Sequence, residues 1–538
     1  MFNRISSFSV ASSSLPAFGI AAKFSQFRTA EMPARKTAAL LVIGDEILKG
    51  TTVDTNSNFL CRKLHSLGVA VKRISVIGDN VEDIQQEVKQ LSAKFDLLFT
   101  TGGVGPTHDD KTYIGIARAF DEPTTVSTEI LDAINKFAPP IEGPANAHEN
   151  SKNTSLASAK EKLSTIPQSS VLLWGQHKRT GKPSAFPVVR IRNVIVFPGI
   201  PRFCQRAFEE LQDQLFPPSE FIPLYSEMIY TSLDEFEFAD KLTAIAKQFD
   251  NKAVEIGSYP EIKHGYYKTK LVVECEDEVV GKHVGDKLKE MLSDSIVYYD
   301  ERPWKSTVEK LQQFRERMVQ KEPEFVSKLD EAMQITTRIV DEYPLDQIAL
   351  SFNGGKDCTV LLHLLRAKVD EKYGPDTPIF GFHIMCDDQF PELTQFIIDA
   401  AKTYNITVME FPGPLKSGLA LLKEARPNVM PVFMGSRATD PRGKYMKSHV
   451  EYTDADWPRV LRVCPILNWT YTDVWKTLRG LCIPYCTLYD QGYTSLGGRE
   501  STRKNPLLRI VTKTGAEIFL PAHKLPSDEH ERHGRSKV

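Results

Sequence analysis

The sequence predicts an α/β protein in which two doubly wound parallel-sheet domains flank a small ferredoxin-like α+β unit. Its 538 residues are too many for one hydrophobic core, because single domains usually contain about 100–200 residues. Apolar strand patterns alternate with helical patterns near both ends of the chain, and this alternation is typical of parallel sheets. The region between them has the order strand, helix, strand, strand, helix, strand, which is typical of a ferredoxin-like unit.

Residues 1–33 differ in composition from the rest of the chain. They contain many serines and the basic residues Arg4, Lys23 and Arg28, and no acidic residue precedes Glu31. Such a composition is typical of a transit peptide. We therefore expect a cytoplasmic protein with a mitochondrial form that depends on residues 1–31, whereas Met32 would start a product without this leader. The alternative is a disordered tail.

Overall composition and charge narrow the range of partners. The chain has 41% hydrophobic and 25% charged residues, close to the average of soluble globular proteins. No stretch approaches the roughly 20 apolar residues that span a bilayer. A formal net charge of −2 provides no general attraction to nucleic acid or to an anionic membrane, so we expect neither as a partner. The eight cysteines lack the paired spacing of a zinc site, which indicates a reducing compartment.

The first parallel sheet is predicted within residues 34–220. Apolar strands at 38–43, 69–77 and 96–100 each run into a polar or glycine-rich turn, and a further strand is expected at 188–196. Because ligands bind where strand carboxyl ends meet the following loops, these turns form a candidate site, whose residues are Asp45, Asp79, Gly102, Gly103, Gly105, Asp109 and Asp110. The glycines could cradle a phosphate, and Asp79, Asp109 and Asp110 could gather a divalent metal. The Pro-, Ser- and Asn-rich residues 141–185 indicate an insertion or a flap.

The middle of the chain is predicted to be structural or regulatory. Residues 221–300 carry the ferredoxin-like pattern and no candidate site residues. Residues 301–345 are charged and have helical periodicity, which indicates a helical linker.

The last predicted domain, residues 346–538, begins with a strand, a glycine loop and a helix. The loop is Asn353-Gly354-Gly355-Lys356-Asp357. Its glycines let backbone N–H groups converge on an anion, and the helix N-terminus adds its positive dipole end. The spacing differs from the kinase-type phosphate loop. It resembles the PP-loop of ATP pyrophosphatases, which cleave ATP between the α and β phosphates.

Later motifs connect this domain with one known family. They include Gly435-Ser436-Arg437, the segment from Arg462 to Tyr471, and Tyr489-Asp490-Gln491-Gly492-Tyr493-Thr494-Ser495-Leu496-Gly497. Together they resemble eukaryotic FAD synthase (FMN adenylyltransferase), which has a fold like that of phosphoadenylyl-sulfate reductase (PAPS reductase). The resemblance implies a nucleotidyltransferase that transfers AMP from ATP to FMN, giving FAD and pyrophosphate with Mg²⁺ as cofactor. Lys504 stands where the family pattern has a proline, which should change loop stiffness more than chemistry.

The resemblance and the chemistry together suggest a role for each residue of the site. FMN carries a phosphate whose second pKa is about 6, so the attack needs no strong general base, and catalysis rests on positioning and charge stabilisation. The expected catalytic residues are Asn353, Lys356, Asp357 and Asp440, and the expected ATP-binding residues are Ser351, Asn353, Gly354, Gly355, Lys356 and Arg437. Flavin-binding residues are expected to be Asp440, Trp469, Arg532 and Arg535. Mg²⁺ needs only about one or two carboxylates, for which Asp357 and Asp440 are the candidates.

The N-terminal motifs resemble the molybdopterin-binding (MoaB/Mog-like) domain in its CinA-like form. By itself this resemblance suggests a pterin ligand. Its fusion to a FAD synthase instead implies a hydrolase of nucleotide pyrophosphates such as FAD, although that inference is one of association.

Two other functions stay open at this point. A sulfonucleotide reductase would share the PP-loop fold, but it needs a nucleophilic cysteine near the end of the chain, and none follows Cys486. A flavin or pterin chaperone without catalytic activity would not need an intact glycine loop. Delivery of FAD to apo-flavoproteins and assembly into a homo-oligomer are further open expectations.

Overall fold

The computed structural model describes residues 35–137, 157–178, 180–250, 253–261, 264–386, 388–441, 443–512 and 515–535. The proposed leader, Met32 and the first part of the expected insertion at 141–185 lie outside the described residues. The chain divides into two compact units, one formed by Met1–Ser226 with Glu274–Gly281 and the other by Glu227–Val273 with Lys282–Val538. None of the helices in the described part of the chain is both long enough and apolar enough to cross a membrane.

The first unit contains a six-stranded sheet with the order β2-β1-β3-β8-β7-β6. Its parallel strands are β1 (Thr37–Ile43), β2 (Ala70–Ile77), β3 (Leu97–Thr101) and β8 (Val194–Phe197). The antiparallel strands β7 (Val188–Ile191) and β6 (Val171–Leu173) complete it. The expected single strand at 188–196 is therefore wrong, because Arg192, at φ 52°, begins a two-residue turn between β7 and β8, as tight hairpins require.

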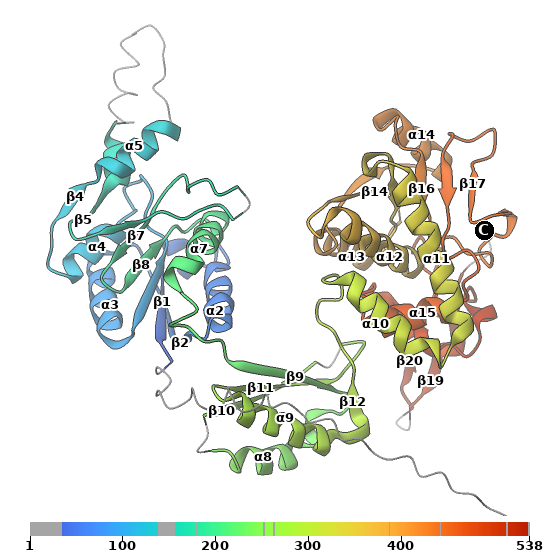
Figure 1. The fold of residues 1–538 in the computed structure, drawn as a ribbon, viewed down its shortest axis with the longest axis horizontal. Coiled ribbons are helices and arrows are strands. Elements are labelled where there is room, and N and C mark those ends of the chain that lie inside the picture. The colour runs from blue at the N-terminus through green and yellow to red at the C-terminus, as the bar shows by residue number, and fades with distance from the viewer. Residues whose placement is uncertain are drawn as a thin grey trace, which may run out of the picture. The chain divides into compact units, whose positions relative to one another are not determined.

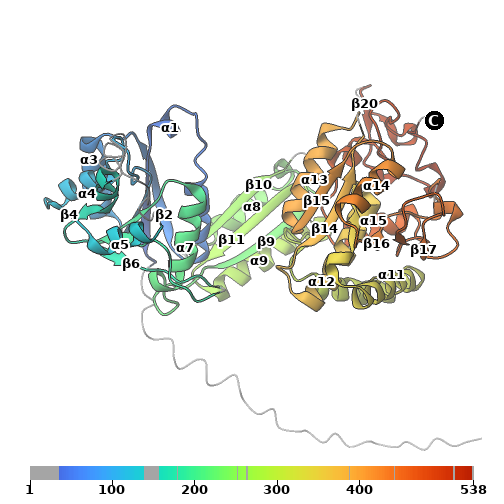
Figure 2. The ribbon, with the colours of Figure 1, turned by 90° about the horizontal axis from the view of Figure 1, so that it is seen from above.

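Side chains of β1 alternate between two hydrophobic cores, as expected for a strand covered on both faces. Ala39, Leu41 and Ile43 pack with α3 (Val81–Lys94) and α4 (Thr112–Ala119). Ala38 and Leu40 pack with α2 (Asn56–Ser66) and α7 (Pro201–Leu215). Figure 1 shows these two helical layers, and Figure 2 again shows α7 opposite α3 and α4. Residues of α5 (Thr128–Phe137) and β5 (Thr165–Pro167) belong to the core of α3 and α4. The remaining elements of this unit are α1 (Asp45–Leu48) and β4 (Thr124–Val126).

The middle region forms a four-stranded sheet with the order β10-β11-β9-β12. Its elements are β9 (Tyr225–Thr231), α8 (Ala239–Lys247), β10 (Val254–Pro260), β11 (Thr269–Cys275), α9 (Glu278–Leu292) and β12 (Ile296–Val297). In this sheet the first strand lies between the third and the fourth, which is the ferredoxin-like arrangement. The predicted unit is therefore confirmed.

The C-terminal sheet has the order β15-β14-β13-β16-β18-β17 and is parallel except for β17. Its strands are β13 (Ala349–Ser351), β14 (Ile379–Ile384), β15 (Ile406–Phe411), β16 (Pro431–Phe433), β17 (Val450–Tyr452) and β18 (Leu461–Val463). Its helices are α12 (Lys356–Tyr373), α13 (Pro391–Thr403), α14 (Leu415–Ala425) and α15 (Tyr471–Gly480). A two-stranded hairpin, β19 (Arg509–Val511) and β20 (Glu517–Phe519), follows.

Residues 301–345 do not form a linker. They form α10 (Thr307–Val319) and α11 (Pro323–Glu342), whose apolar residues Phe314, Phe325 and Leu329 belong to the same buried core as α12 and α15. The charged residues that suggested a linker occupy the outer faces of these helices, as in any amphipathic surface helix.

The order of the C-terminal strands determines where a ligand site can form. Strand β13 lies between β14 and β16, so the strand order reverses beside it. Loops after the strands at such a switch point diverge and leave a crevice at the carboxyl ends. The glycine loop follows β13 and Arg437 follows β16, so the topology brings these two segments together.

Candidate active site

The glycine loop is shaped by its own backbone and by Asn353. Gly354 has φ 71°, and a Cβ there would lie 2.8 Å from Leu393 Cδ1, so no other residue fits without strain. The Asn353 side-chain oxygen accepts the Gly355 N–H (3.0 Å) and the Cys358 thiol (2.9 Å). Ser351 ends β13 just before this turn. The loop is thus preformed, and the side-chain oxygen of Asn353 is engaged in hydrogen bonds within it.

Arg437 reaches the start of α12 because two segments approach unusually closely. A Cβ on Gly435 would lie 2.7 Å from the Cys358 backbone nitrogen, so a glycine is required there. The approach places Arg437 Nε 2.8 Å from Asp357 Oδ1, with the guanidinium almost completely buried. Asp357 Oδ2 also accepts a hydrogen bond from Lys356 Nζ (3.0 Å). A carboxylate therefore bridges the two cations that the sequence singled out.

Opposing effects set the charge state of Asp357. Burial alone would raise the pKa of its carboxyl, but the cations Lys356 and Arg437 outweigh burial and lower that pKa below its ordinary value. Burial alone would likewise lower the pKa of the Lys356 ammonium, but the carboxylates around it raise that pKa. The site therefore keeps its buried charges, since each is paired.

Asp440 lies at the edge of this cluster. Its Oδ2 accepts the backbone N–H of Arg437 (2.8 Å), and its Oδ1 lies 3.9 Å from Arg437 Nη2 and from Arg532 Nη1. Burial, followed by the negative charge of Asp357, raises the pKa of the Asp440 carboxyl. A divalent cation between the two carboxylates would relieve this repulsion.

Asp357 and Asp440 are the carboxylates with which the expected Mg²⁺ would be held. The described residues contain no group of three or more His, Cys, Asp or Glu side chains arranged to hold a metal. Mg²⁺ does not need such a cage, because it is usually bound through one or two carboxylates together with substrate phosphates and water.

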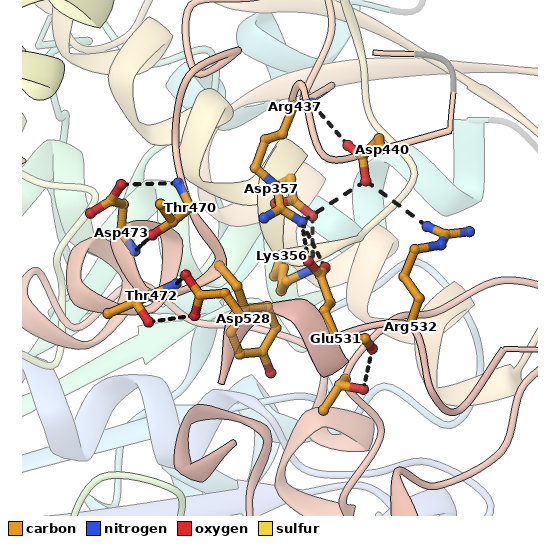
Figure 3. Close-up of polar contacts among 12 residues, drawn as sticks. Lys356, Asp357, Arg437, Asp440, Thr470, Thr472, Asp473, Asp528, Glu531 and Arg532 are labelled. Atoms are coloured by element: carbon orange, nitrogen blue, oxygen red, sulfur yellow. Dashed lines mark hydrogen bonds and ion pairs between the residues drawn. The ribbon is translucent and has the colours of Figure 1, made fainter. Parts of the chain in front are cut away.

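Sequence reasoning missed three residues of the site, Glu531, Tyr471 and Tyr489. The Glu531 carboxylate lies between Lys356 and Arg437, as Figure 3 shows. The Tyr489 hydroxyl accepts the backbone N–H of Lys356 (3.0 Å), and the Lys356 ammonium lies 5.3 Å from the centre of the Tyr471 ring. Tyr471 and Tyr489 stand in the motifs that marked the family. Glu531 directly precedes Arg532 in the segment expected to bind flavin, but it was given no role because a glutamate in a polar tail usually faces water.

Only some of the residues expected to bind flavin lie close to one another. Arg532 is about two-fifths exposed beside Asp440, while Arg535 forms an isolated β-bridge with Thr502, and its Nε is buried without a hydrogen-bond partner. The prediction that Trp469 binds flavin is wrong. Only 1% of this residue is exposed, and its ring packs against Phe325 in the hydrophobic core. Its aromatic character reflects core packing rather than a ligand face.

In the first unit, Asp45 and Asp79 meet at the ends of β1 and β2, and Gly102 follows β3. The Asp45 backbone N–H donates to Asp79 Oδ2 (3.0 Å), and the Asp79 N–H lies 3.3 Å from Asp45 Oδ1. Gly102 has φ 105°, and a Cβ there would lie 1.9 Å from the Ile43 carbonyl oxygen. Burial raises the pKa of Asp79, and the carboxylates of Glu46, Asp45 and Asp109 add to this shift.

The expected metal set in this unit, Asp79, Asp109 and Asp110, is not formed among the described residues. Asp110 instead turns back into its own loop, where its Oδ2 accepts from the Thr107 N–H (2.8 Å) and hydroxyl (2.6 Å), while a Cβ on Gly105 would collide with it. The Asp109 side chain is 63% exposed. Gly103 adopts φ 62° beside Thr112. The glycine turn is present, but its carboxylates do not converge.

The C-terminal unit thus has the fold and loop of a PP-loop nucleotide-binding domain, with paired buried charges at its switch point. Comparison with known proteins agrees with this class. Residues 347–427 and 419–504 match the phosphoadenosine phosphosulfate reductase domain, residues 223–301 match the middle domain of FAD synthase, and residues 39–217 match the probable molybdopterin binding domain.

Full-length relatives are similar over nearly the whole chain. A probable FAD synthase of Caenorhabditis elegans is 60% identical over 515 residues, which cover 95% of this chain and 99% of that protein. One of Caenorhabditis briggsae is 58% identical over 516 residues, with 95% and 99% covered. This chain belongs to the FAD synthase family. A crystal structure of Candida glabrata FMN adenylyltransferase with FMN and an ATP analogue is also similar, with 25% identity and a TM-score of 0.39 over 44% of this chain and 98% of that one.

Proposed function

We propose that the C-terminal domain catalyses transfer of AMP from ATP to FMN, giving FAD and pyrophosphate. The observation that carries the proposal is the buried charge cluster of Lys356, Asp357 and Arg437 directly behind a preformed glycine loop at the switch point. Its arrangement suits a reaction between two phosphate-bearing substrates, because the charges are fixed before the ligands arrive.

The reaction needs no proton transfer. A phosphate oxygen of FMN attacks the α-phosphorus of ATP, the bond between the α-phosphorus and the bridging oxygen breaks, and pyrophosphate leaves with the electron pair. The chain's residues hold the phosphates in line and offset the charge that develops on them. Arg437 can offer its Nη1, which has no hydrogen-bond partner, and the exposed Arg532 lies next to Asp440. When bound, Mg²⁺ supplies charge neutralisation at the phosphates, and Asp357 and Asp440 would hold it.

The environment of the cysteines favours this reaction over sulfonucleotide reduction. Burial raises the pKa of the Cys486 thiol to about 11 and that of Cys358 to about 12. A nucleophilic cysteine needs the opposite shift, since the thiolate is the reactive form.

For the first unit we propose hydrolysis of a nucleotide pyrophosphate such as FAD. The proposal is supported by Asp45 and Asp79 beside a strained glycine turn at adjacent strand ends, and by the attachment of this unit to a FAD-forming domain. A mitochondrial form, delivery of FAD to apo-flavoproteins and a homo-oligomer remain proposals from the sequence.

The synthase proposal is tested by incubating the purified full chain with FMN, ATP and Mg²⁺ and following FAD and pyrophosphate. Equal amounts of both products are expected. Consumption of ATP without FAD, or formation of FAD without pyrophosphate, would contradict the proposed reaction.

A further inference from the structure

Glu531 carries a buried carboxylate that sequence reasoning left without a role. Its Oε1 lies 2.5 Å from Lys356 Nζ, and both of its oxygens lie 2.6 Å from Arg437 Nη2. Only 6% of the residue is exposed. Together with Asp357, it completes a square of alternating charges that Figure 3 shows at the centre of the site.

The backbone around Glu531 is held by neutral groups. The Glu531 carbonyl oxygen accepts from the Thr494 hydroxyl (2.6 Å), and the preceding His530 carbonyl accepts from Asn505 Nδ2 (2.8 Å). Three residues earlier, Asp528 accepts from the Thr472 hydroxyl at the start of α15 (2.6 Å). After Glu531, the Gly534 carbonyl accepts from the Arg503 backbone N–H (2.7 Å), so the segment has anchors of its own on both sides. None of these contacts involves the Glu531 carboxylate.

The carboxylate instead determines what the two cations can do. Lys356 is saturated by Asp357, Glu531 and the faces of Tyr471 and Tyr489, and it is only 2% exposed. Arg437 has Nε in an ion pair with Asp357 and Nη2 hydrogen-bonded to Glu531, while neither Nε nor Nη1 has a hydrogen-bond partner among the described residues. Two carboxylates thus hold the guanidinium from two sides and leave its Nη1 as the donor for an anion.

We propose that Glu531 is a positioning residue for adenylyl transfer, which holds Arg437 in the orientation that presents Nη1 to a substrate phosphate and keeps Lys356 as a buried counter-ion. The proposal rests on the FMN adenylyltransferase function stated above. It assigns Lys356 a supporting role and makes Arg437 the cation that meets the phosphates. The same contacts have a competing interpretation, in which Glu531 occupies a phosphate position and is displaced by ATP.

The test compares Glu531→Gln with Glu529→Gln in the full chain. Glu529 is an exposed glutamate two residues away, so its variant removes the same charge from the same segment. Glu531→Gln should lower kcat for FAD formation by about 10- to 100-fold, because charge-assisted hydrogen bonds that orient Arg437 are lost. The Tm should fall as well, because Lys356 and Arg437 each lose one of their two buried carboxylate partners, so kcat is compared at a temperature at which both variants are folded. Glu529→Gln should behave like the wild type, and a wild type that makes no FAD would refute the function rather than this role.

A second measurement separates positioning from a purely structural role. If Glu531 acts through Arg437, the double variant Glu531→Gln/Arg437→Lys should be about as slow as the slower single variant, because both changes disturb one unit. Independent losses that multiply would overturn the proposal. A fall in KM for ATP with unchanged kcat in Glu531→Gln would also overturn it, in favour of a displaced anion. If Glu531→Gln does not fold, Glu531→Asp keeps the charge one methylene further away, and wild-type kcat in that variant would contradict precise positioning.

Discussion

Replacing Asp357 by asparagine tests the charge cluster most directly, because the substitution keeps the shape and removes one charge. Asp357 makes a 3.0 Å hydrogen bond with Lys356 and a 2.8 Å ion pair with Arg437. Hydrogen bonds to charged groups contribute about 1.5–3 kcal/mol each. If most of one such contribution is realised in the transition state, turnover falls roughly 100-fold, which corresponds to about 2.7 kcal/mol.

The assay is steady-state FAD formation with saturating FMN, ATP and Mg²⁺, with Tm measured in parallel. Asp399→Asn is the matched control, because Asp399 is an exposed residue of α13 whose side chain accepts from Gln395 on the same helix. We expect the control to keep its turnover. Turnover of Asp357→Asn within about threefold of the wild type, a change of less than 1 kcal/mol, would refute the view that the paired charges position the reacting phosphates.

Four further predictions follow from particular residues. The raised pKa of Asp440 means that its ionised form is unfavourable in the folded state, so stability is lost as the pH rises above the ordinary value of 3.8. Asp440→Asn should therefore raise Tm by about 2 °C at pH 7.5 without Mg²⁺. A lower Tm in a calorimetric scan would contradict this sign. A fragment starting at residue 301 should make FAD but have a lower melting temperature than a fragment starting at residue 223. The shorter fragment lacks Tyr266, whose hydroxyl donates to the carbonyls of Leu478 and Ile483. Equal melting temperatures would show that these contacts contribute nothing. Asp79→Asn should reduce any FAD hydrolysis, measured as AMP release, and leave synthesis intact, and loss of both activities would show that the two sites are not separate. A reporter fused to residues 1–31 should enter mitochondria, whereas a diffuse signal in the microscope would indicate a simple tail.

Local pattern was sufficient to predict the three larger sheets and the glycine loop. A strand that is apolar on both faces, such as β1, is recognisable without its neighbours, since both side-chain sets are buried. The loop at Asn353–Asp357 is equally local, because Gly354 needs a positive φ whatever surrounds it. The many charged residues of 301–345 led to the wrong prediction of a linker. These charges belong to amphipathic helices, and the apolar residues of α10 and α11 are part of the core.

Residue type alone did not distinguish a tryptophan buried in the core from one that contacts a ligand. Trp469 stands in a family motif, but its burial against Phe325 depends on α11, which lies more than a hundred residues earlier. In the same way, Asp109 and Asp110 follow a strand end closely, yet Asp110 bonds to Thr107 in its own turn. Such choices depend on side-chain directions within a loop, which spacing does not specify.

By itself, the sequence determined that this protein has a phosphate-binding loop between a strand and a helix, because backbone conformation and the helix dipole are local properties. It also determined which arginines, lysine and aspartates were available to that loop. Only the tertiary structure decided which of them meet. The reversal of strand order at β13 brings Arg437 to Asp357, and neutral anchors bring Glu531 from the far end of the domain between Arg437 and Lys356. The physical reason is that a buried ion pair needs partners within about 4 Å, and separation along the chain does not reveal that distance.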